Sequence, residues 1–314
     1  MFTLVVPVYR NEASIPDLLQ TVESIDRGMR GGFEVVFVVD GSPDRSFDLL
    51  QGGLDKAAFR SQLLLLSRNF GSFAAIRAGL EAGRGSSFGV MSADGQEPPE
   101  LVLAFAERLR TGHFDVVIGS RTSRGDPLAI RAASRLFWSA YRCLVQRDVP
   151  AGGVDVFGCT AQVRNLILSM NEGNSTLVGL LLWLGFRREV VKYERLPRRH
   201  GKSGWSFGRR LRYMLDSVFA FSDLPIRLLS LCGLCGILLS LGLGILVLAM
   251  KAVGAIPIPG YAATVMVVMF FGGLNSLGLG LIGEYVWRAF ENTKQRPGHV
   301  VAVKIEYSGK PEVQ

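Results

Sequence analysis

The sequence has few histidines and cysteines, and it lacks two common nucleotide-binding patterns. Histidine is scarce, with 3 in all, and does not point to a typical zinc site or a Ser-His-Asp triad. No GxGxxG follows the apolar run Phe2–Val8, and no GxxxxGK(S/T) occurs anywhere, so neither a dinucleotide fingerprint nor a P-loop is supported. The same run is too short and wrongly flanked for a signal peptide, so the 4 cysteines need no disulfide in a reducing cytosol.

Charge is missing from two long stretches in the C-terminal third. No charged residue occurs in the 23 residues from Leu228 to Met250 or in the 32 residues from Ala252 to Gly283, where only Ile-Pro-Ile-Pro-Gly at 256–260 interrupts the run. At about 1.5 Å per residue, helices near 228–250 and 261–283 would each cross a hydrocarbon core of roughly 30 Å. We expect a transmembrane hairpin; two buried helices of a soluble protein are the alternative.

Basic residues flank this hairpin on its outer sides. They are Arg209, Arg210, Arg212 and Arg227 before the first span and Arg288, Lys294 and Arg296 after the second. The connection between the spans holds only Lys251. Because lysine and arginine accumulate on the cytoplasmic side, the pattern predicts a protein of the inner (cytoplasmic) membrane with a cytosolic large domain and both termini in the cytosol.

An amphipathic segment precedes the first span. Apolar side chains recur on one helical arc at Phe207, Leu211, Met214, Leu215, Val218 and Phe221, with Arg209, Arg212 and Asp216 opposite. A soluble amphipathic helix has the same pattern, but adjacency to the hairpin favours a helix in the membrane interface. We therefore divide the chain into a globular domain (1–206), a juxtamembrane helix (207–226), the hairpin (227–284) and a cytosolic tail (285–314).

The first 120 residues alternate between short apolar runs and helical patterns. The predicted strands are Phe2–Val8, Glu34–Val39, Gln62–Leu66, Ser87–Met91 and Asp115–Ile118, and the predicted helices are Ile15–Ser24, Ser46–Ala57, Phe73–Ala82 and Glu100–Leu109. This alternation predicts an α/β domain with a parallel sheet covered by helices. Ligands bind such sheets beyond the carboxyl ends of the strands.

Polar residues gather at those carboxyl ends. The five segments are Pro7-Val8-Tyr9-Arg10-Asn11-Glu12, Asp40-Gly41-Ser42-Pro43-Asp44, Ser67-Arg68-Asn69-Phe70-Gly71, Ser92-Ala93-Asp94 and Gly119-Ser120-Arg121. Each alone could be an ordinary turn, but all five at one sheet edge indicate a ligand site. Carboxylates suit a divalent cation that neutralises a nucleotide diphosphate, and nearby basic groups suit the phosphates. The basic segment Arg198–Trp205 could close over such a ligand or could contact lipid headgroups.

Taken in order, these motifs resemble those of family 2 glycosyltransferases of GT-A (Rossmann-like) fold, in particular the polyprenyl-phosphate group that includes dolichyl-phosphate mannose synthase and bactoprenol glucosyltransferases. The motifs are VPVYRNE, VDGSPD, SRNFG, SADGQEPPE, VIGSR, GGVDVF, GKSGW, the hairpin and GEYVWR-x₇-RP. The resemblance implies inverting transfer of a hexose from a UDP- or GDP-sugar to the phosphate of undecaprenyl or dolichyl phosphate, for a cell-envelope glycan or glycoconjugate. It implies a bilayer partner and no nucleic acid, and small residues on the spans allow a homo-oligomer.

The resemblance also implies roles for individual residues. The nucleotide-sugar pocket would contain Pro7, Tyr9, Glu12, Asp40, Ser42, Asn69, Ala93 and Lys202. The lipid phosphate would be held by Arg121, Arg131 and Ser134, and Asp155 would lie near the acceptor as a base or as a group that orients an arginine. Asp94 matches the metal-binding acid of the Asp-x-Asp signature, and implies Mg²⁺ or Mn²⁺.

Two positions depart from the family pattern. Ser92 stands where many members have the first Asp of Asp-x-Asp, and Val39 stands where many have an acid or Asn. A cation would then rest mainly on Asp94, donor phosphates and water, which suits Mg²⁺. A catalytically weak or inactive nucleotide-sugar-binding membrane subunit is the alternative function. A processive polysaccharide synthase is disfavoured, since no QxxRW signature occurs.

Overall fold

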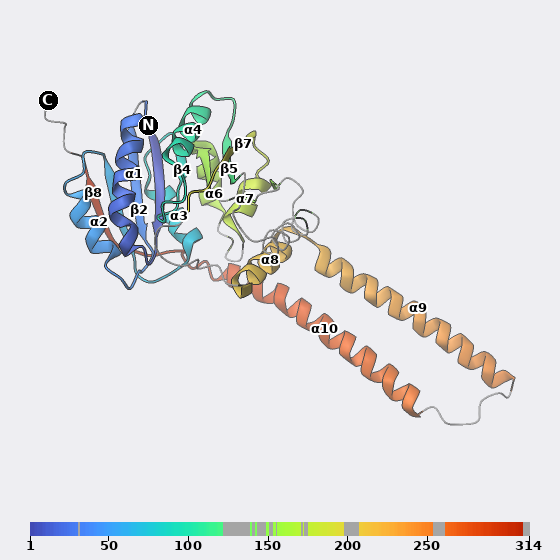
Figure 1. Cartoon of the computed structure of the whole chain (residues 1–314). Helices are drawn as coiled ribbons and strands as arrows, with labels where there is room; N and C mark the ends of the chain where they lie inside the picture. The colour runs from blue at the N-terminus through green and yellow to red at the C-terminus, as the bar shows by residue number, and fades with distance from the viewer. Residues whose placement is uncertain are drawn as a thin grey trace.

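The structure is a computed structural model, and it describes most of the chain. The described residues are 1–30, 32–121, 139, 142, 149–150, 153–154, 156–170, 172, 175–197, 207–253 and 261–309. In Figure 1 the α/β domain and the long helical hairpin lie at opposite ends of the molecule, with a short helix between them.

A mixed sheet of eight strands forms the centre of the domain. Its order is β7-β5-β6-β4-β1-β2-β3-β8. The strands are β1 (Phe2–Val8), β2 (Phe33–Val39), β3 (Ser61–Leu66), β4 (Ser87–Val90), β5 (Val116–Arg121), β6 (Val156–Thr160), β7 (Arg188–Tyr193) and β8 (Val301–Tyr307). Strands β1 to β4 are mutually parallel, whereas β6 runs antiparallel to β4 and β5, and β8 runs antiparallel to β3.

Helices cover both faces of this sheet. The bounds are α1 (Ile15–Gly28), α2 (Ser46–Leu54), α3 (Ser72–Ala82), α4 (Pro99–Arg110), α6 (Ala161–Ser169) and α7 (Leu177–Trp183), with a short 3₁₀ turn, η1 (Glu12–Ser14), before α1. Because side chains alternate along a strand, the sheet supplies two apolar faces. One face packs against α1, α2 and α4, and the other packs against α3, α6 and α7.

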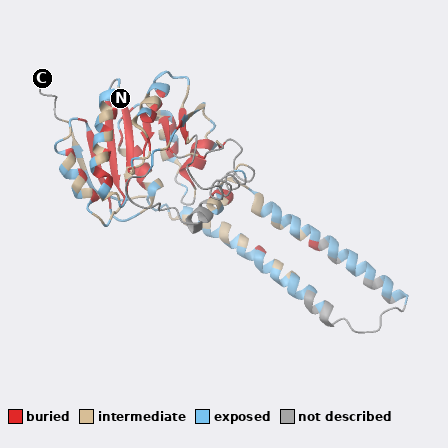
Figure 2. Cartoon of the chain, in the orientation of Figure 1, coloured by how far each residue is buried: buried red, intermediate tan, exposed pale blue. Residues whose placement is uncertain are grey.

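Three further helices follow the domain. They are α8 (Phe207–Phe221), α9 (Leu224–Ala252) and α10 (Tyr261–Thr293). Segments Leu224–Leu246 and Val267–Thr293 are long and apolar enough to cross a membrane, and only 6% and 0% of their most apolar windows are buried. Figure 2 shows the contrast between the buried strands and the exposed surface of α9 and α10. Core helices of a soluble protein would be mostly buried, so this exposure fits the predicted hairpin.

The five predicted strands and four predicted helices are confirmed, with small shifts at their ends. The parallel sheet expected from residues 1–120 is confirmed in that β1 to β5 all run in one direction, and two antiparallel strands, β6 and β8, join the sheet from later in the chain. One of these, β8, comes from the segment expected to be a tail. Its residues Ile305 and Tyr307 pack against the main core cluster, which explains why it joins the sheet.

Candidate active site

The carboxyl ends of five strands meet at one edge of the sheet. Strands β1 to β4 are parallel, and β5 runs in the same direction because both β4 and β5 are antiparallel to β6. The edge therefore carries the segments that follow Val8, Val39, Leu66 and Val90, and it carries Arg121 at the end of β5. The sequence predicted this convergence, and the strand directions confirm it.

The loops after β1 and β2 are joined by hydrogen bonds. The backbone N–H of Arg10 donates to Ser42 Oγ at 2.8 Å, and the Ser42 hydroxyl donates to Asp44 Oδ1 at 2.6 Å. Asp44 also accepts from the backbone N–H groups of Glu12 and Ser46, at 3.1 and 3.2 Å. Burial raises the pKa of the Asp44 carboxyl, but these hydrogen bonds outweigh that effect and hold the pKa below its usual value. The ionised Asp44 carboxylate thus holds the loops after β1 and β2 together.

Arg10 and Tyr9 present an aromatic surface at this edge. Arg10 has a φ of 55°, a left-handed backbone conformation that is uncommon for a residue with a side chain. Its guanidinium lies 5.4 Å from the centroid of the Tyr9 ring, and Tyr9 is 41% exposed. An exposed ring next to a cation is suited to stacking against a planar base.

Asp40 lies at the end of β2 and braces the loop after β3. Its side chain is 2% exposed, and its two carboxylate oxygens accept from the backbone N–H groups of Phe70 and Gly71 at 2.7 and 2.8 Å. Gly41 has a φ of 53°, and a Cβ on it would lie 2.2 Å from the backbone carbonyl carbon of Arg68. The loop that carries Asn69 is therefore held against the β2 end by a buried carboxylate and by a close backbone contact that only glycine permits.

Asp94 lies two residues beyond Ser92 in the loop after β4. Its Oδ1 accepts from the Ser92 hydroxyl at 2.7 Å and from the backbone N–H of Gln96 at 3.3 Å. Asp94 is half-buried. Two donors on one oxygen fix the direction of this carboxylate at the edge of the sheet.

Glu97 is a buried carboxyl beside the same serine. It is 3% exposed, and its Oε2 accepts from the Ser92 backbone N–H at 3.1 Å and contacts the Ser92 hydroxyl oxygen. Burial raises the pKa of Glu97, and the negative charge of Asp94 adds to this, while Ser92 and Arg195 oppose it. The nearest Arg195 nitrogen lies 4.0 Å from Oε1. Glu97 thus favours its neutral, protonated form more than an exposed glutamate does.

The residues after β7 brace this loop from the other side. The backbone N–H of Leu196 donates to the Gln96 carbonyl at 2.9 Å, and the Gln96 side-chain amide donates to the Leu196 carbonyl at 3.2 Å. Arg195 is the partner of Glu97 described above. The basic segment 198–206 begins directly after this contact and lies outside the described residues.

The described residues fit a cation that relies on few protein ligands. No group of three or more His, Cys, Asp or Glu side chains capable of holding a metal occurs within the described part of the chain. Asp94, the acid that the resemblance assigns to the cation, is half-buried and held by hydrogen bonds at this edge. Mg²⁺ usually keeps several waters and takes one or two carboxylates plus phosphate oxygens, so the residues present fit a phosphate-bound Mg²⁺ or Mn²⁺.

The remaining predicted site residues divide into two groups. Pro7 lies in β1, Arg121 ends β5 beside Tyr193, and Ala93 is 3% exposed within the core. Arg131, Ser134, Asp155 and Lys202 lie outside the described residues. The structure thus brings Tyr9, Glu12, Asp40, Ser42, Asn69, Asp94 and Arg121 to one edge of the sheet. Their contacts with ligands stay predictions.

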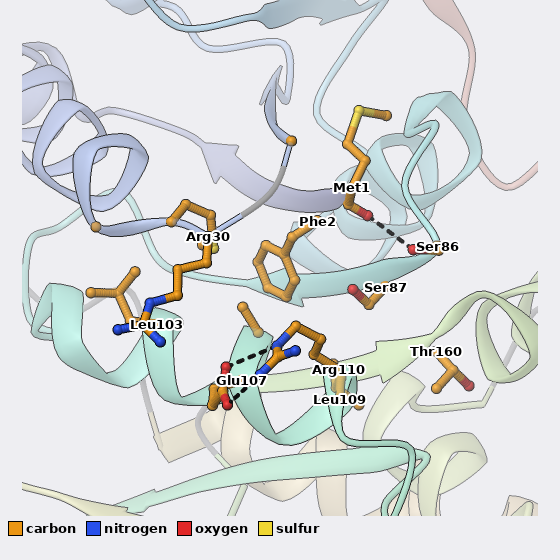
Figure 3. A pocket seen from close by; sticks show the side chains of 14 residues that line it. Met1, Phe2, Arg30, Ser86, Ser87, Leu103, Glu107, Leu109, Arg110 and Thr160 are labelled. Atoms are coloured by element: carbon orange, nitrogen blue, oxygen red, sulfur yellow. Dashed lines mark hydrogen bonds and ion pairs between the residues drawn. The ribbon is translucent and has the colours of Figure 1, made fainter.

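A cavity of about 650 Å³ lies at the opposite edge of the sheet. Met1 and Phe2 at the start of β1, Ser87 at the start of β4 and Arg110 at the end of α4 line it, as Figure 3 shows. Arg110 is paired with Glu107 at 2.9 Å. The cavity contains none of the predicted site residues, so its position does not mark the site that the strand ends define.

Sequence reasoning did not single out Glu97 or Arg195. Glu97 lies inside the SADGQEPPE motif, where only its burial separates it from an ordinary loop acid. Arg195 is far from the motif in sequence, and the contact depends on β7 pairing with β5. The one available signal in the sequence was that Glu97 lies five residues after Ser92, the position where the family pattern has an acid.

Comparison with known proteins agrees with this geometry. Residues 3–165 match the family described as "Glycosyl transferase family 2". The chain is 36% identical over 307 residues to "Undecaprenyl-phosphate 4-deoxy-4-formamido-L-arabinose transferase" of Pseudomonas paraeruginosa, which covers 95% of this chain and 88% of the relative. It is 32% identical to "Uncharacterized glycosyltransferase YkcC" of Bacillus subtilis, over 96% of this chain and 93% of the relative.

Among solved structures, the chain is similar to "Crystal structure of S. aureus TarS 1-349 in complex with UDP-GlcNAc". The identity is 18%, the TM-score is 0.47, and the match covers 71% of this chain and 67% of that chain. The family match extends over half of the sequence and includes every strand end from β1 to β5. The chain therefore belongs to glycosyl transferase family 2 and is a glycosyltransferase of GT-A architecture.

Proposed function

We propose that this glycosyltransferase transfers a hexose from a nucleotide-sugar to the phosphate of a membrane polyprenyl phosphate, with inversion at the anomeric carbon. The observation that carries the proposal is the combination of a polar strand-end edge with an exposed apolar hairpin in one chain. The 36%-identical relative is named for transfer to undecaprenyl phosphate, which supports the same acceptor class here.

Contacts of α8 with α7 and α10 connect the globular domain to the hairpin, which supports a fixed position of the strand-end edge relative to the proposed membrane spans. A Cβ on Gly179 of α7 would lie 2.3 Å from the Phe221 ring of α8, so the two helices are in close contact. On the other side, Arg288 of α10 donates to Asp216 of α8 at 2.8 Å, and the Phe219 and Tyr285 rings lie 5.4 Å apart. The helix next to the hairpin is thus packed against both the globular domain and α10.

The acceptor chemistry explains why a membrane anchor is useful. A polyprenyl chain leaves the bilayer at a cost of about 0.8 kcal/mol per exposed CH₂, so the enzyme must reach the lipid phosphate at the interface. We place the globular domain and both termini in the cytosol, with α9 and α10 across the inner membrane, because arginines flank the two spans on the same side. Oligomers through the small residues of the spans are compatible with this placement.

Positioning and charge stabilisation are the chemistry that the site offers. A phosphate monoester has a second pKa of about 6, so the acceptor is already a nucleophile and mainly needs orientation. Arg121 at the end of β5 would hold that phosphate, with Arg131 and Ser134 as further contacts. Tyr9, Glu12, Asp40, Ser42 and Asn69 would bind or shape the pocket for the nucleoside, and Lys202 would contact the donor diphosphate.

A divalent cation would complete the donor site. When bound at Asp94, Mg²⁺ or Mn²⁺ supplies positive charge to the leaving nucleoside diphosphate. Asp94 would provide a carboxylate ligand to that cation, together with donor phosphate oxygens and water. Asp155 would orient an arginine or accept a proton near the acceptor.

The test is a donor panel with purified full-length protein. Labelled UDP- and GDP-sugars are incubated with undecaprenyl phosphate and MgCl₂, and a chloroform-soluble labelled lipid is measured. At least one donor should give the labelled lipid, and Asp94→Ala should lower its rate about 100-fold or more because charge stabilisation at the leaving group is lost. Asp55→Ala, which removes an exposed acid at the end of α2, is the matched control.

Failure of every donor would refute the acceptor and donor assignment. Full activity of Asp94→Ala alongside a working wild type would refute the role of Asp94 alone. Donor binding without any transfer would instead favour a binding subunit.

A further inference from the structure

One hydroxyl group connects two carboxyl groups in the loop after β4. The Ser92 hydroxyl oxygen lies 2.7 Å from Asp94 Oδ1 and is also in hydrogen-bond contact with Glu97 Oε2. A serine hydroxyl has one hydrogen, and it can donate only one of these two bonds. The other contact requires a second proton on one of the carboxyl groups.

Burial favours Glu97 over Asp94 as the carrier of this second proton. Glu97 is 3% exposed, whereas Asp94 is half-buried, and ionisation costs most where water is excluded. The charged groups that the described residues place near Glu97 are Asp94, which disfavours its ionisation, and Arg195, which is 4.0 Å away. Protonated Glu97 then donates to Ser92 Oγ, and the Ser92 hydroxyl donates to Asp94.

The same Glu97 oxygen has a second partner. Oε2 also accepts from the Ser92 backbone N–H at 3.1 Å. The hydroxyl oxygen of a protonated carboxyl group can donate one hydrogen bond and accept another at the same atom, whereas an ionised carboxylate oxygen can only accept. A glutamine cannot reproduce this, because its amide nitrogen does not accept and its amide oxygen does not donate.

We propose that Glu97 is a positioning residue of this enzyme, which acts through the Ser92 hydroxyl to hold the Asp94 carboxylate in the orientation that binds the donor's cation. The inference rests on the proposed function, since the cation at Asp94 is part of it. The inference gives Ser92 a role at a position where the family pattern has an acid. Ser92 would not add a second carboxylate to the cation; its hydroxyl would link the buried Glu97 to Asp94. Hydrogen-bonded neighbours of metal-binding carboxylates typically change metal affinity about 10- to 100-fold when they are removed.

The experiment measures binding of labelled UDP, and separately of labelled GDP, to detergent-purified full-length protein at increasing MnCl₂. The readout is the Mn²⁺ concentration that gives half-maximal nucleotide binding. Ser92→Ala and Glu97→Gln should each raise this concentration about tenfold. The double variant should raise it by the same factor as either single variant, because Glu97 acts only through Ser92. Glu100→Gln, which alters an exposed acid in the first turn of α4, is the matched control and should have no effect.

Three outcomes would overturn the inference or its foundation. An unchanged Mn²⁺ requirement in Ser92→Ala, with a wild-type melting temperature, would refute it. A double variant that loses about 100-fold would show that Glu97 acts independently of Ser92, as a direct ligand would, and would also refute it. Nucleotide binding by the wild type that does not depend on Mn²⁺ would instead refute the cation in the proposed function, and the inference with it. Ser92→Ala removes only a half-buried hydroxyl, so an unchanged Mn²⁺ requirement in this variant would refute the inference even if Glu97→Gln does not fold.

Discussion

Replacing Asp40 with asparagine tests whether its carboxylate is mainly a structural anchor. The two oxygens accept from Phe70 N–H and Gly71 N–H at 2.7 and 2.8 Å, directly before α3, and the side chain is 2% exposed. Asparagine keeps one acceptor and turns an NH₂ group toward the other N–H. A hydrogen bond to a charged group contributes about 1.5–3 kcal/mol, so the loss should be about 2 kcal/mol of unfolding free energy. For a domain of this size that corresponds to a melting temperature lower by about 4–8 °C.

The assay is thermal unfolding of the full-length protein in detergent, followed together with UDP and GDP binding. Asp55→Asn is the control, since it makes the same chemical change at an exposed acid at the end of α2. We expect Asp40→Asn to lower both the melting temperature and nucleotide affinity, because the loop with Asn69 is released. A variant that loses nucleotide binding but melts like the wild type would refute the reasoning, and would show that Asp40 acts by contact with the ligand.

Three further predictions concern the packing of the domain. Gly79→Ala should destabilise the fold by about 1–3 kcal/mol, because a Cβ there would lie 2.3 Å from a core valine. Gly52→Ala should instead stabilise α2 by about 0.5–1 kcal/mol, because a Cβ at this position meets nothing within 4 Å. Chemical denaturation measures both changes in the free energy of unfolding. Equal effects of the two changes would contradict the packing argument. Hydrogen bonds from Arg84 and Lys304 lower the pKa of Glu306 to about 2, so the stabilisation that these contacts give should be complete above pH 4.5 and should be lost as the pH falls toward 2. The difference in melting temperature between wild type and Glu306→Gln should shrink over that range, and a constant difference would refute the assignment. Ending the chain at Pro297 should remove β8 and its six paired positions on β3, and a melting temperature equal to that of the full chain would show that β8 adds nothing to the sheet.

The sequence was sufficient to predict β1 to β5, because each strand is a compact apolar run followed by a turn residue. The helices between them are amphipathic and begin with clear signals, such as Pro16 in α1 and Pro99 in α4. The hairpin was predictable from the absence of charge alone. The structure extends α10 to Thr293, because polar residues continue the same helix beyond the apolar part.

The antiparallel members of the sheet could not be predicted in the same way. Val301, Val303, Ile305 and Tyr307 alternate with small or charged residues, a pattern typical of a strand, but β8 pairs with β3 across more than 230 residues of sequence, and the pattern alone does not identify that partner. For β6, the sequence does not indicate that the strand inserts between β4 and β5. Pairings of this kind depend on which edge the finished sheet leaves open, which a local pattern does not encode.

At the site, sequence order predicted where the residues would converge but not how they contact one another. Asp40 was expected to touch the ligand, and its visible interactions are with backbone N–H groups of a neighbouring loop. Ser92 was noted only as a missing acid that leaves the cation mainly on Asp94, whereas the structure shows its hydroxyl in contact with both Asp94 and Glu97. Hydrogen-bond partners of this kind depend on side-chain rotamers and on segments far apart in sequence, such as Arg195.

The segments on either side of the hairpin belong to the two outermost strands of the same sheet. The chain leaves by β7, at one margin, and comes back as β8, at the other. An enzyme tethered by a single strand of polypeptide could swivel freely over the lipid surface, whereas one fastened at two separated points cannot. In the proposed function, with α9 and α10 across the membrane, this double attachment would limit rotation of the domain and hold the strand-end edge in one orientation toward the lipid phosphate.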